Sequence, residues 1–293
     1  MGYLFLALSL FAGATKGFCG KTISGKVQSL KGTFYINFIR MVLCIAVGFF
    51  VVVFESLSSF KVDAITLLIT ALSGISTAMF VVFWIISVRR GAYVMLDVFL
   101  MLGVGVTIAL CRIFFNEPIF MNQYIGLLLL VLASAIMCSY SASVKNKFTV
   151  KSFLTLLACG IFNGLTDFSQ KLFINYSSDG SVGVFNFYTY IFSAIVLLVF
   201  YSILNHRENA QNDGKSKSIF IYILIMAICL FANSFFKTLA AKYIDSATLY
   251  PISTGAALIL SVIMASVFFK EKVTPKCVIG VIIAFISLII INL

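Results

Sequence analysis

The sequence predicts an all-α membrane protein of ten transmembrane helices, arranged as two inverted five-helix repeats. Two observations support this prediction: a strongly apolar composition and a motif that occurs twice. Hydrophobic residues make up 61% of the 293 residues, charged residues only 11%, and the mean hydropathy is +1.10. A soluble domain is about half apolar and about a quarter charged, so this chain holds more apolar surface than one aqueous core can bury.

Ten apolar stretches are each long enough to cross a bilayer as a helix, which takes roughly 20 predominantly apolar residues. Stretches such as residues 279–293 are apolar on every side, whereas the strands of a transmembrane barrel alternate between apolar and polar. The connections are too short to hold a soluble domain, and we expect no cleavable signal peptide. The expected spans are residues 3–23, 33–54, 64–86, 92–115, 120–142, 151–174, 183–204, 218–240, 246–269 and 275–293.

A motif of two phenylalanines, one further residue and a glutamate occurs twice at the ends of apolar stretches. It stands at Phe114–Glu117 and again, 154 residues later, at Phe268–Glu271. Each glutamate is followed nine residues on by a glycine, which is Gly126 or Gly280. The spacing is a little over half of the chain, and a repeat this long indicates two similar halves.

The two halves, residues 1–146 and 147–293, each contain five of the expected spans. Because five is an odd number and each span reverses the chain, the second half enters the membrane in the opposite orientation to the first. Inverted repeats of this kind typically place a substrate site near the middle of the membrane, between the halves. The pattern therefore favours a carrier of a small molecule.

Small residues at a spacing of four predict close packing between helices. They occur as Gly13 with Gly17 in the first half and as Gly160 with Gly164 in the second. These two pairs lie 147 residues apart, whereas nearby Lys21 and Lys171 lie 150 residues apart, so the sequence supports two different alignments of this region.

The formal charge of +11 is interpreted as loop charge rather than as a nucleic-acid surface. Fifteen of the 21 Lys and Arg residues lie at connections that follow odd-numbered spans. The positive-inside rule then places those connections in the cytoplasm and both chain ends outside. The seven cysteines lack the spacing of metal ligands or disulfide frameworks and are interpreted as small core residues. We expect no metal, no cofactor and no nucleic-acid partner.

Ionisable side chains within the spans are costly, by about 2.5–3.5 kcal/mol each, and are therefore functional candidates. Asp97 and Asp167 are candidates for proton coupling, because a carboxylate shielded from water can exchange a proton near neutral pH. The alternative for either aspartate is a pair with Lys or Arg, or a cap on a broken helix. Lys16 and Arg40 are candidates for holding a substrate carboxylate or phosphate, and the alternative for them is contact with lipid headgroups.

Further polar residues in and beside the spans divide into structural and substrate-binding candidates. Glu117 and Glu271 are interpreted as structural groups that bond loop amides or neighbouring helices. Lys21 and Lys171 are interpreted as lysines that extend to lipid headgroups, and Trp84 as an anchor at the membrane interface. The remaining substrate-binding candidates are Ser76, Tyr93, Asn163, Asn233, Tyr250 and Ser253.

The chain resembles the drug/metabolite transporter superfamily, in its ten-helix EamA-like branch, over nearly its whole length. The resemblance rests on the duplicated motif, on the similarity of Gly13–Lys21 to Gly164–Lys171, and on Ala240–Ala247 followed by Pro251. It implies secondary transport of small metabolites or drugs, often export, and places both chain ends in the cytoplasm, opposite to the charge count. The chain departs from the family at Asp97, which matches Pro251 in the first half, and the first span has no tryptophan.

The function favoured by these observations is secondary active export of a small metabolite or drug across the cytoplasmic (plasma) membrane, by alternating access and coupled to protons. The alternatives are an antiporter of carboxylate or phosphate metabolites, a passive channel and, disfavoured, an intramembrane enzyme. The chain contains no GxxxxGK[ST] or HExxH motif, and its one histidine, His206, lies in a polar loop. We expect no enzymatic activity, a small-molecule substrate and the lipid bilayer as partners, and a monomer or homodimer.

Overall fold

The part of the chain that the structure describes folds into ten helices, which correspond to the ten expected spans. The computed structural model describes residues 1–24, 26, 29–55, 60, 62–89, 93–141, 150–177, 180–205, 217–270 and 275–292, and no strand occurs among them. The helices are α1 (Gly2–Ser24), α2 (Leu30–Glu55), α3 (Ala64–Arg89), α4 (Tyr93–Phe115), α5 (Met121–Ser141), α6 (Val150–Tyr176), α7 (Val182–Asn205), α8 (Lys217–Ala240), α9 (Ser246–Val267) and α10 (Pro275–Asn292).

The outer surface of the helices is apolar, as a bilayer requires. Seven helices, α1 to α3 and α6 to α9, are long and apolar enough to cross a membrane, and the described parts of α4, α5 and α10 contain shorter apolar segments. Large apolar side chains such as Phe11 and Phe54 are 76% and 88% exposed, which is unfavourable in water and suits contact with lipid. The protein is therefore a multi-pass membrane protein.

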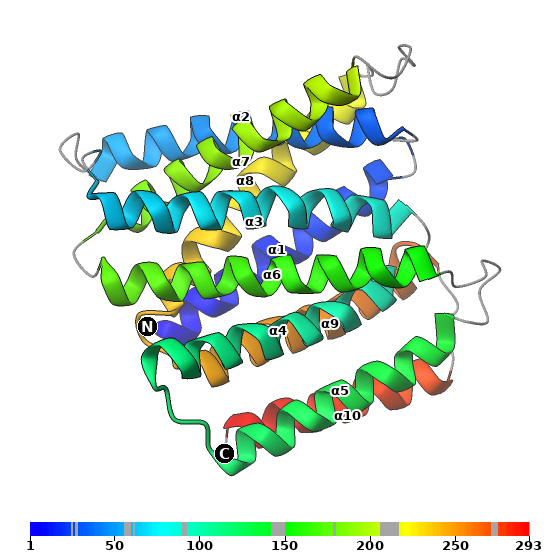
Figure 1. Ribbon diagram of the computed structural model, residues 1–293. Coiled ribbons are helices and arrows are strands. Elements are labelled where there is room, and N and C mark those ends of the chain that lie inside the picture. Colours follow the sequence, from blue (N-terminus) through cyan, green and yellow to red (C-terminus); the bar gives the residue numbers. More distant parts are fainter. Residues whose placement is uncertain are drawn as a thin grey trace.

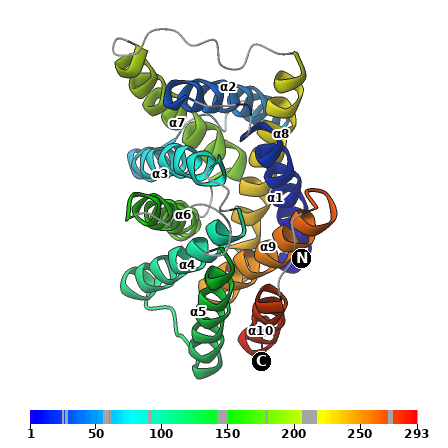
Figure 2. The same ribbon diagram turned by 90° about the vertical axis from the view of Figure 1, so that its right-hand side faces the viewer.

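The helices lie nearly side by side, and the chain reverses direction from each one to the next (Figure 1). Both chain ends consequently lie at one end of the bundle, and the connections that follow odd-numbered helices lie at the other. Seen along the helices, α3, α6 and α4 form one wall and α8, α1 and α9 form the opposite wall (Figure 2). Helices α2 and α7 pack together at one edge of these walls, and α5 and α10 pack together at the other.

Helices α4 and α6 approach each other until their backbones touch. A Cβ atom added to Gly103 would lie 2.1 Å from the Gly160 carbonyl oxygen, and one added to Gly164 would lie 2.3 Å from the Gly103 carbonyl oxygen. The Thr107 hydroxyl donates across the same contact to the Gly164 carbonyl at 3.0 Å. The close packing predicted for Gly160 and Gly164 is thus confirmed, since any larger side chain would force the two helices apart.

The two motif copies end their helices with the same backbone conformation. Asn116 and Lys270 each have φ of 52°, and they are the only non-glycine residues with positive φ in the described part of the chain. A left-handed residue is a common way to end a helix, and asparagine tolerates it better than most residues. The Asn116 amide still donates to the Arg112 carbonyl at 3.1 Å, which closes the last turn of α4.

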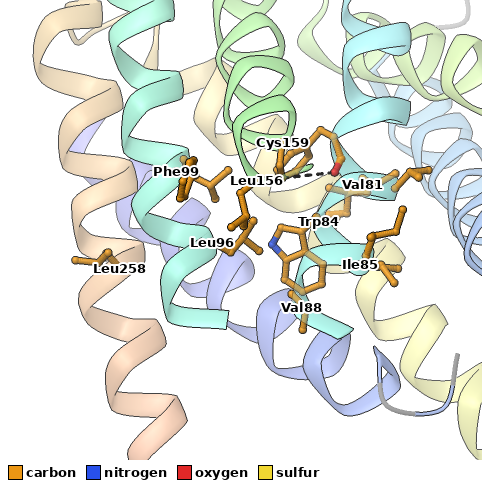
Figure 3. Packing of buried hydrophobic residues seen from close by; sticks show 14 of the residues in the cluster. Val81, Trp84, Ile85, Val88, Leu96, Phe99, Leu156, Cys159 and Leu258 are labelled. Carbon is orange, nitrogen blue, oxygen red and sulfur yellow. Dashed lines mark hydrogen bonds between the residues drawn. The ribbon is translucent and has the colours of Figure 1, made fainter. Parts of the chain in front are cut away.

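A tightly packed apolar cluster joins α3, α4 and α6 next to the space between the two walls. Trp84 of α3 lies among Val81, Leu96 and Leu156 and is only 8% exposed (Figure 3). The thiol of Cys159 lies 3.9 Å from the Phe80 carbonyl oxygen, which ties α6 to α3. The interpretation of Trp84 as an interface anchor is therefore wrong, because its ring is buried inside the bundle.

Candidate functional site

A cavity of about 100 Å³ lies between the two walls of the bundle. Three helices from the first half of the chain, α1, α3 and α4, and three from the second half, α6, α8 and α9, contribute to its lining. Phe80 and Trp84 supply an aromatic side. The polar part of the lining consists of Lys16, Asn163, Asn233, Lys237, Ser253, Thr254 and Ser261.

Two cations stand at one side of this cavity. Lys16 lines it and places its ammonium group 5.9 Å from the centre of the Phe80 ring. Arg40 of α2 is 2% exposed and lines a second, smaller space of about 10 Å³, which it shares with Lys16, Phe80 and Trp84. The Arg40 Nε atom has no hydrogen-bond partner. Among the described residues neither cation forms an ion pair.

A buried ion pair is a further polar feature of the site. Lys237 of α8 lines the cavity, and its Nζ atom lies 2.5 Å from Oδ1 of Asp167 on α6. Asp167 is 1% exposed, and its second oxygen, Oδ2, has no hydrogen-bond partner. The Tyr250 hydroxyl donates to the Asp167 backbone carbonyl at 2.7 Å, which fixes this turn of α6 against α9. The pair thus connects α6 to α8 at the cavity wall.

A second ion pair ties four helices together near the chain ends. Glu117, just beyond α4, accepts a bond from Lys171 of α6 at 3.0 Å, and its other oxygen accepts the Ser246 amide at the start of α9 at 3.1 Å. Lys171 also donates to the Ala241 carbonyl at the end of α8, at 3.3 Å. Glu117 therefore bonds both a loop amide and a neighbouring helix, as its structural interpretation requires. Lys171 is buried, so its interpretation as a headgroup lysine is wrong.

A separate hollow of about 200 Å³ lies between α3, α6 and α7, near the start of α3. Asp63 precedes α3 and accepts the Thr66 amide at 3.3 Å, as expected of a residue that caps a helix. The hydrogen bond from the Thr66 side chain lowers the pKa of the exposed Asp63 carboxyl. Across the hollow, the hydroxyl groups of Thr66 and Ser177 are 2.7 Å apart. These bonds join α3 to α6 and are independent of the central cavity.

The comparisons with known proteins agree with this architecture. A model of the EamA-like transporter family matches residues 144–293, which is half of the chain. The chain belongs to the EamA-like transporter family. The resemblance stated from the sequence is thereby confirmed, and the EamA-like family is a family of transporters.

Solved structures support the fold of this EamA-like protein. A crystal structure of a protein superposes on the chain with a TM-score of 0.77, and the match covers 99% of this chain and 95% of that one. At 12% sequence identity the likeness concerns the fold alone. A search among curated proteins finds no match.

The structure gathers only part of the predicted site residues around the cavity of this EamA-like chain. Lys16, Asn163, Asn233 and Ser253 line the cavity, and Arg40 lines the adjoining space. Asn233 also donates to the backbone carbonyl and the hydroxyl of Ser9, at 2.8 and 3.0 Å, and so links α8 to α1.

The other predicted residues stand elsewhere or are not described. Tyr250 is fully buried behind Asp167, and Ser76 is buried in α3, and neither lines the cavity. The backbones of Tyr93 and Asp97 belong to α4, but their side chains lie outside the part of the chain that the structure describes. Asp167 contributes through its bond to Lys237 rather than by lining the cavity.

The sequence analysis did not predict Lys237, Phe80 or Trp84 as contributors to the cavity. The partnership of Lys237 with Asp167, 70 residues earlier, has no local sequence signal. Phe80 and Trp84 are two of many aromatic residues, and nothing in the sequence separates them from lipid-facing rings. Their spacing of four on a helix was the one available hint, because such residues share a face.

Proposed function

We propose that this EamA-like protein is a secondary active transporter that exports a small metabolite across the plasma membrane by alternating access. The observation that carries the proposal is the cavity itself, which has polar as well as apolar lining residues, lies inside the bundle and is lined by three helices from each half of the chain. In a transporter of inverted repeats, rocking of one half against the other exposes such a site first to one side and then to the other.

The proposal treats residues 1–146 and 147–293 as the two repeats, and the helix contacts support this division. If α1 to α5 are matched in order with α6 to α10, the contact between α1 and α8 has its counterpart in the contact between α6 and α3. Helices α2, α4 and α5 contact their own counterparts, α7, α9 and α10. The shared φ of 52° at Asn116 and Lys270 supports the same matching.

Proton coupling is assigned to Asp167 within this proposal. Protonation of its carboxylate removes the charge that holds Lys237, and the freed ammonium group then faces the cavity. Binding of a proton thus changes the charge that a substrate meets at the cavity wall, as in the proton relays that intramembrane carboxylates form. The unpaired Oδ2 atom of Asp167 is available to take the proton.

Transport is tested with the purified full chain in proteoliposomes that are incubated in a cell metabolite extract, with and without a pH gradient. We expect one or a few metabolites to accumulate by at least about tenfold over protein-free liposomes, since each transporter turns over many times. Cells that lack the gene should retain the same compound. If no metabolite accumulates in either gradient direction, the chain is not a transporter of this kind.

Proton coupling is tested by Asp167→Asn in the same vesicles. The variant should still exchange substrate across the membrane, but a pH gradient should no longer drive accumulation, because Asn cannot bind and release a proton. Asp63→Asn is the matched control, since Asp63 is an exposed carboxylate outside the spans. Accumulation that still responds fully to the gradient in Asp167→Asn would remove this residue from the coupling role.

A further inference from the structure

The charges around the cavity do not balance. Lys16 and Lys237 line the cavity and Arg40 lines the adjoining space, whereas Asp167 is the carboxylate that meets this group of three cations among the described residues. Asp167 is already bonded to Lys237. Lys16 and Arg40 therefore remain as two positive charges inside the membrane without an acidic partner in the described part of the chain.

A buried cation without a partner weakens a protein, because desolvation of the charge is not offset by a nearby anion. Arg40 is the stronger case, since it is 2% exposed and its Nε–H group donates to no acceptor. Arginine cannot relieve this cost by losing its proton. Such a group needs a counter-charge, and a bound anion can supply it.

The space around the two cations suits the charged end of a ligand. The smaller space of about 10 Å³ beside Arg40 is about the size needed for one water molecule or one ligand oxygen. Lys16, Phe80 and Trp84 line both this space and the larger cavity, so the two spaces adjoin. Across the cavity, Asn163 has no hydrogen-bond partner among the described residues and can bond a polar group farther along the ligand.

We infer that the substrate is a small organic anion, whose carboxylate or phosphate group binds between Lys16 and Arg40. This inference rests on the proposed transport function and names its substrate class. Guanidinium presents a fork of donors that matches the oxygens of either anion, and the lysine adds a second charge. The rings of Phe80 and Trp84 contact the carbon skeleton, and Asn163 and Ser253 lie on the lining beyond them.

Binding is tested by thermal unfolding of the purified full chain with matched probes. Succinate and glycerol 3-phosphate are compared with their uncharged counterparts, succinamide and glycerol. We expect at least one anion to raise the melting temperature increasingly with its concentration, and the uncharged partner of that anion to have no effect. A ligand that binds only the folded state stabilises it by RT ln(1 + L/Kd), where L is the free ligand concentration.

The variants Lys16→Gln and Arg40→Gln should each weaken binding of that anion by about tenfold or more, as expected when a charged hydrogen-bond donor is lost. Lys21→Gln and Lys31→Gln are the matched controls, because each removes one charge from the same helix, α1 or α2, outside the cavity. These controls should change the affinity by less than about twofold. Equal losses in the controls would overturn the inference.

A structural role for Arg40 is separated from a binding role by the melting temperature of the empty protein. Arg40→Met removes an unpaired buried charge, so the empty variant should melt at the same temperature as the parent chain or higher, while stabilisation by the anion disappears. A variant that melts well below the parent chain would show that Arg40 holds the fold, and would overturn the inference.

The vesicle assay separates this inference from the proposed function. If only anions accumulate, and the anion that stabilises the protein competes with them, the result supports both the substrate class and the transport function. Accumulation of uncharged or cationic compounds, unaffected by Lys16→Gln, overturns the substrate class and leaves transport standing. Stabilisation only by lipids with anionic headgroups, with no effect of soluble anions, would assign the two cations to lipid and overturn the inference. If nothing accumulates, the transport function fails.

Discussion

Two contacts between the halves of this EamA-like protein occupy matching places in the fold but differ in how tightly they close. Helix α4 meets α6, and its counterpart α9 meets α1. Between α4 and α6 the backbones touch. A Cβ atom added to Gly160 would lie only 2.2 Å from the Phe99 carbonyl oxygen. Between α1 and α9 lies the cavity, and a Cβ atom added to Gly13 would meet only the side-chain amide of Asn233, at 3.0 Å.

The residues of α1 and α9 that line the cavity correspond in the repeat to residues of α4 and α6, which form the close contact. At the 154-residue spacing of the repeat, Ser253, Ala257 and Ser261 on α9 correspond to Phe99, Gly103 and Thr107 on α4. At the spacing of 147, Gly13 and Gly17 on α1 correspond to Gly160 and Gly164 on α6. The α9 and α1 members all line the cavity, whereas Gly103, Thr107, Gly160 and Gly164 form the sealed contact.

The difference between the two contacts indicates how the proposed alternation proceeds. If the two halves exchange conformations, α1 closes on α9 as α6 now closes on α4, and the contact between α4 and α6 opens. The glycines of α1 are then required for a contact that does not exist in the present structure. This explains why glycine, which weakens a helix by about 1 kcal/mol relative to alanine, stands at position 13, where an added Cβ atom would now meet only the Asn233 side chain.

Alanine substitutions on the two sides should produce the largest contrast. Gly160→Ala forces α4 from α6, an overpacking that costs about 1–3 kcal/mol, so the melting temperature should fall by about 5 °C. Gly13→Ala should lower the melting temperature by less than Gly160→Ala does, because the new methyl group would meet only the side-chain amide of Asn233, at 3.0 Å, and no backbone atom. Transport should nevertheless fall by about tenfold in Gly13→Ala, since closure of α1 on α9 is blocked.

The control for this comparison is Gly105→Ala, because a Cβ atom added to Gly105 of α4 has no neighbour within 4 Å. This variant should keep both its stability and its transport rate. Normal transport by a well-folded Gly13→Ala protein would show that α1 never closes on α9, and the proposed exchange between the two contacts would fail.

The fold was predictable from the sequence because its determinants are local. Each span is a run of apolar residues of membrane length, and the duplicated motif from Phe114 and from Phe268 marks corresponding helix ends. The close contact of Gly160 and Gly164 followed from spacing alone, since residues four apart share one helix face.

The site was predictable only in part, because the sequence does not tell which face of a transmembrane helix points inward. A helix that is apolar all round lacks the amphipathic pattern that orients a surface helix. Tyr250 and Ser253 stand within one turn of α9, yet Ser253 lines the cavity and Tyr250 packs behind Asp167. The partnerships of Lys171 with Glu117 and of Lys237 with Asp167 likewise depend on contacts between distant segments, which no local pattern encodes.

Cysteine labelling should give a smaller but more direct contrast between the two contacts. In a background without the seven native cysteines, Ser261→Cys should react with a small hydrophilic thiol reagent at least about tenfold faster than Thr107→Cys, because reactivity follows access to the thiol. Ser261 is only 3% exposed but lines the cavity, whereas its counterpart Thr107 is 0% exposed and packs against Gly164. Equal rates at the two positions would contradict an open and a closed contact.

The same labelling decides which way the chain lies in the membrane. Figure 1 places both chain ends at one end of the bundle, but the basic connections suggest that this end is outside and the family resemblance suggests that it is cytoplasmic. Reagent is therefore added to either side of sealed vesicles that carry a cysteine at Lys26, in the connection after α1, or at Asp63, before α3. Because these residues lie at opposite ends of the bundle, each should react from one side only. Labelling of the Lys26 position from the cytoplasmic side would place both chain ends outside. Once the orientation is known, the side from which Ser261→Cys reacts is the side to which the cavity opens in this structure.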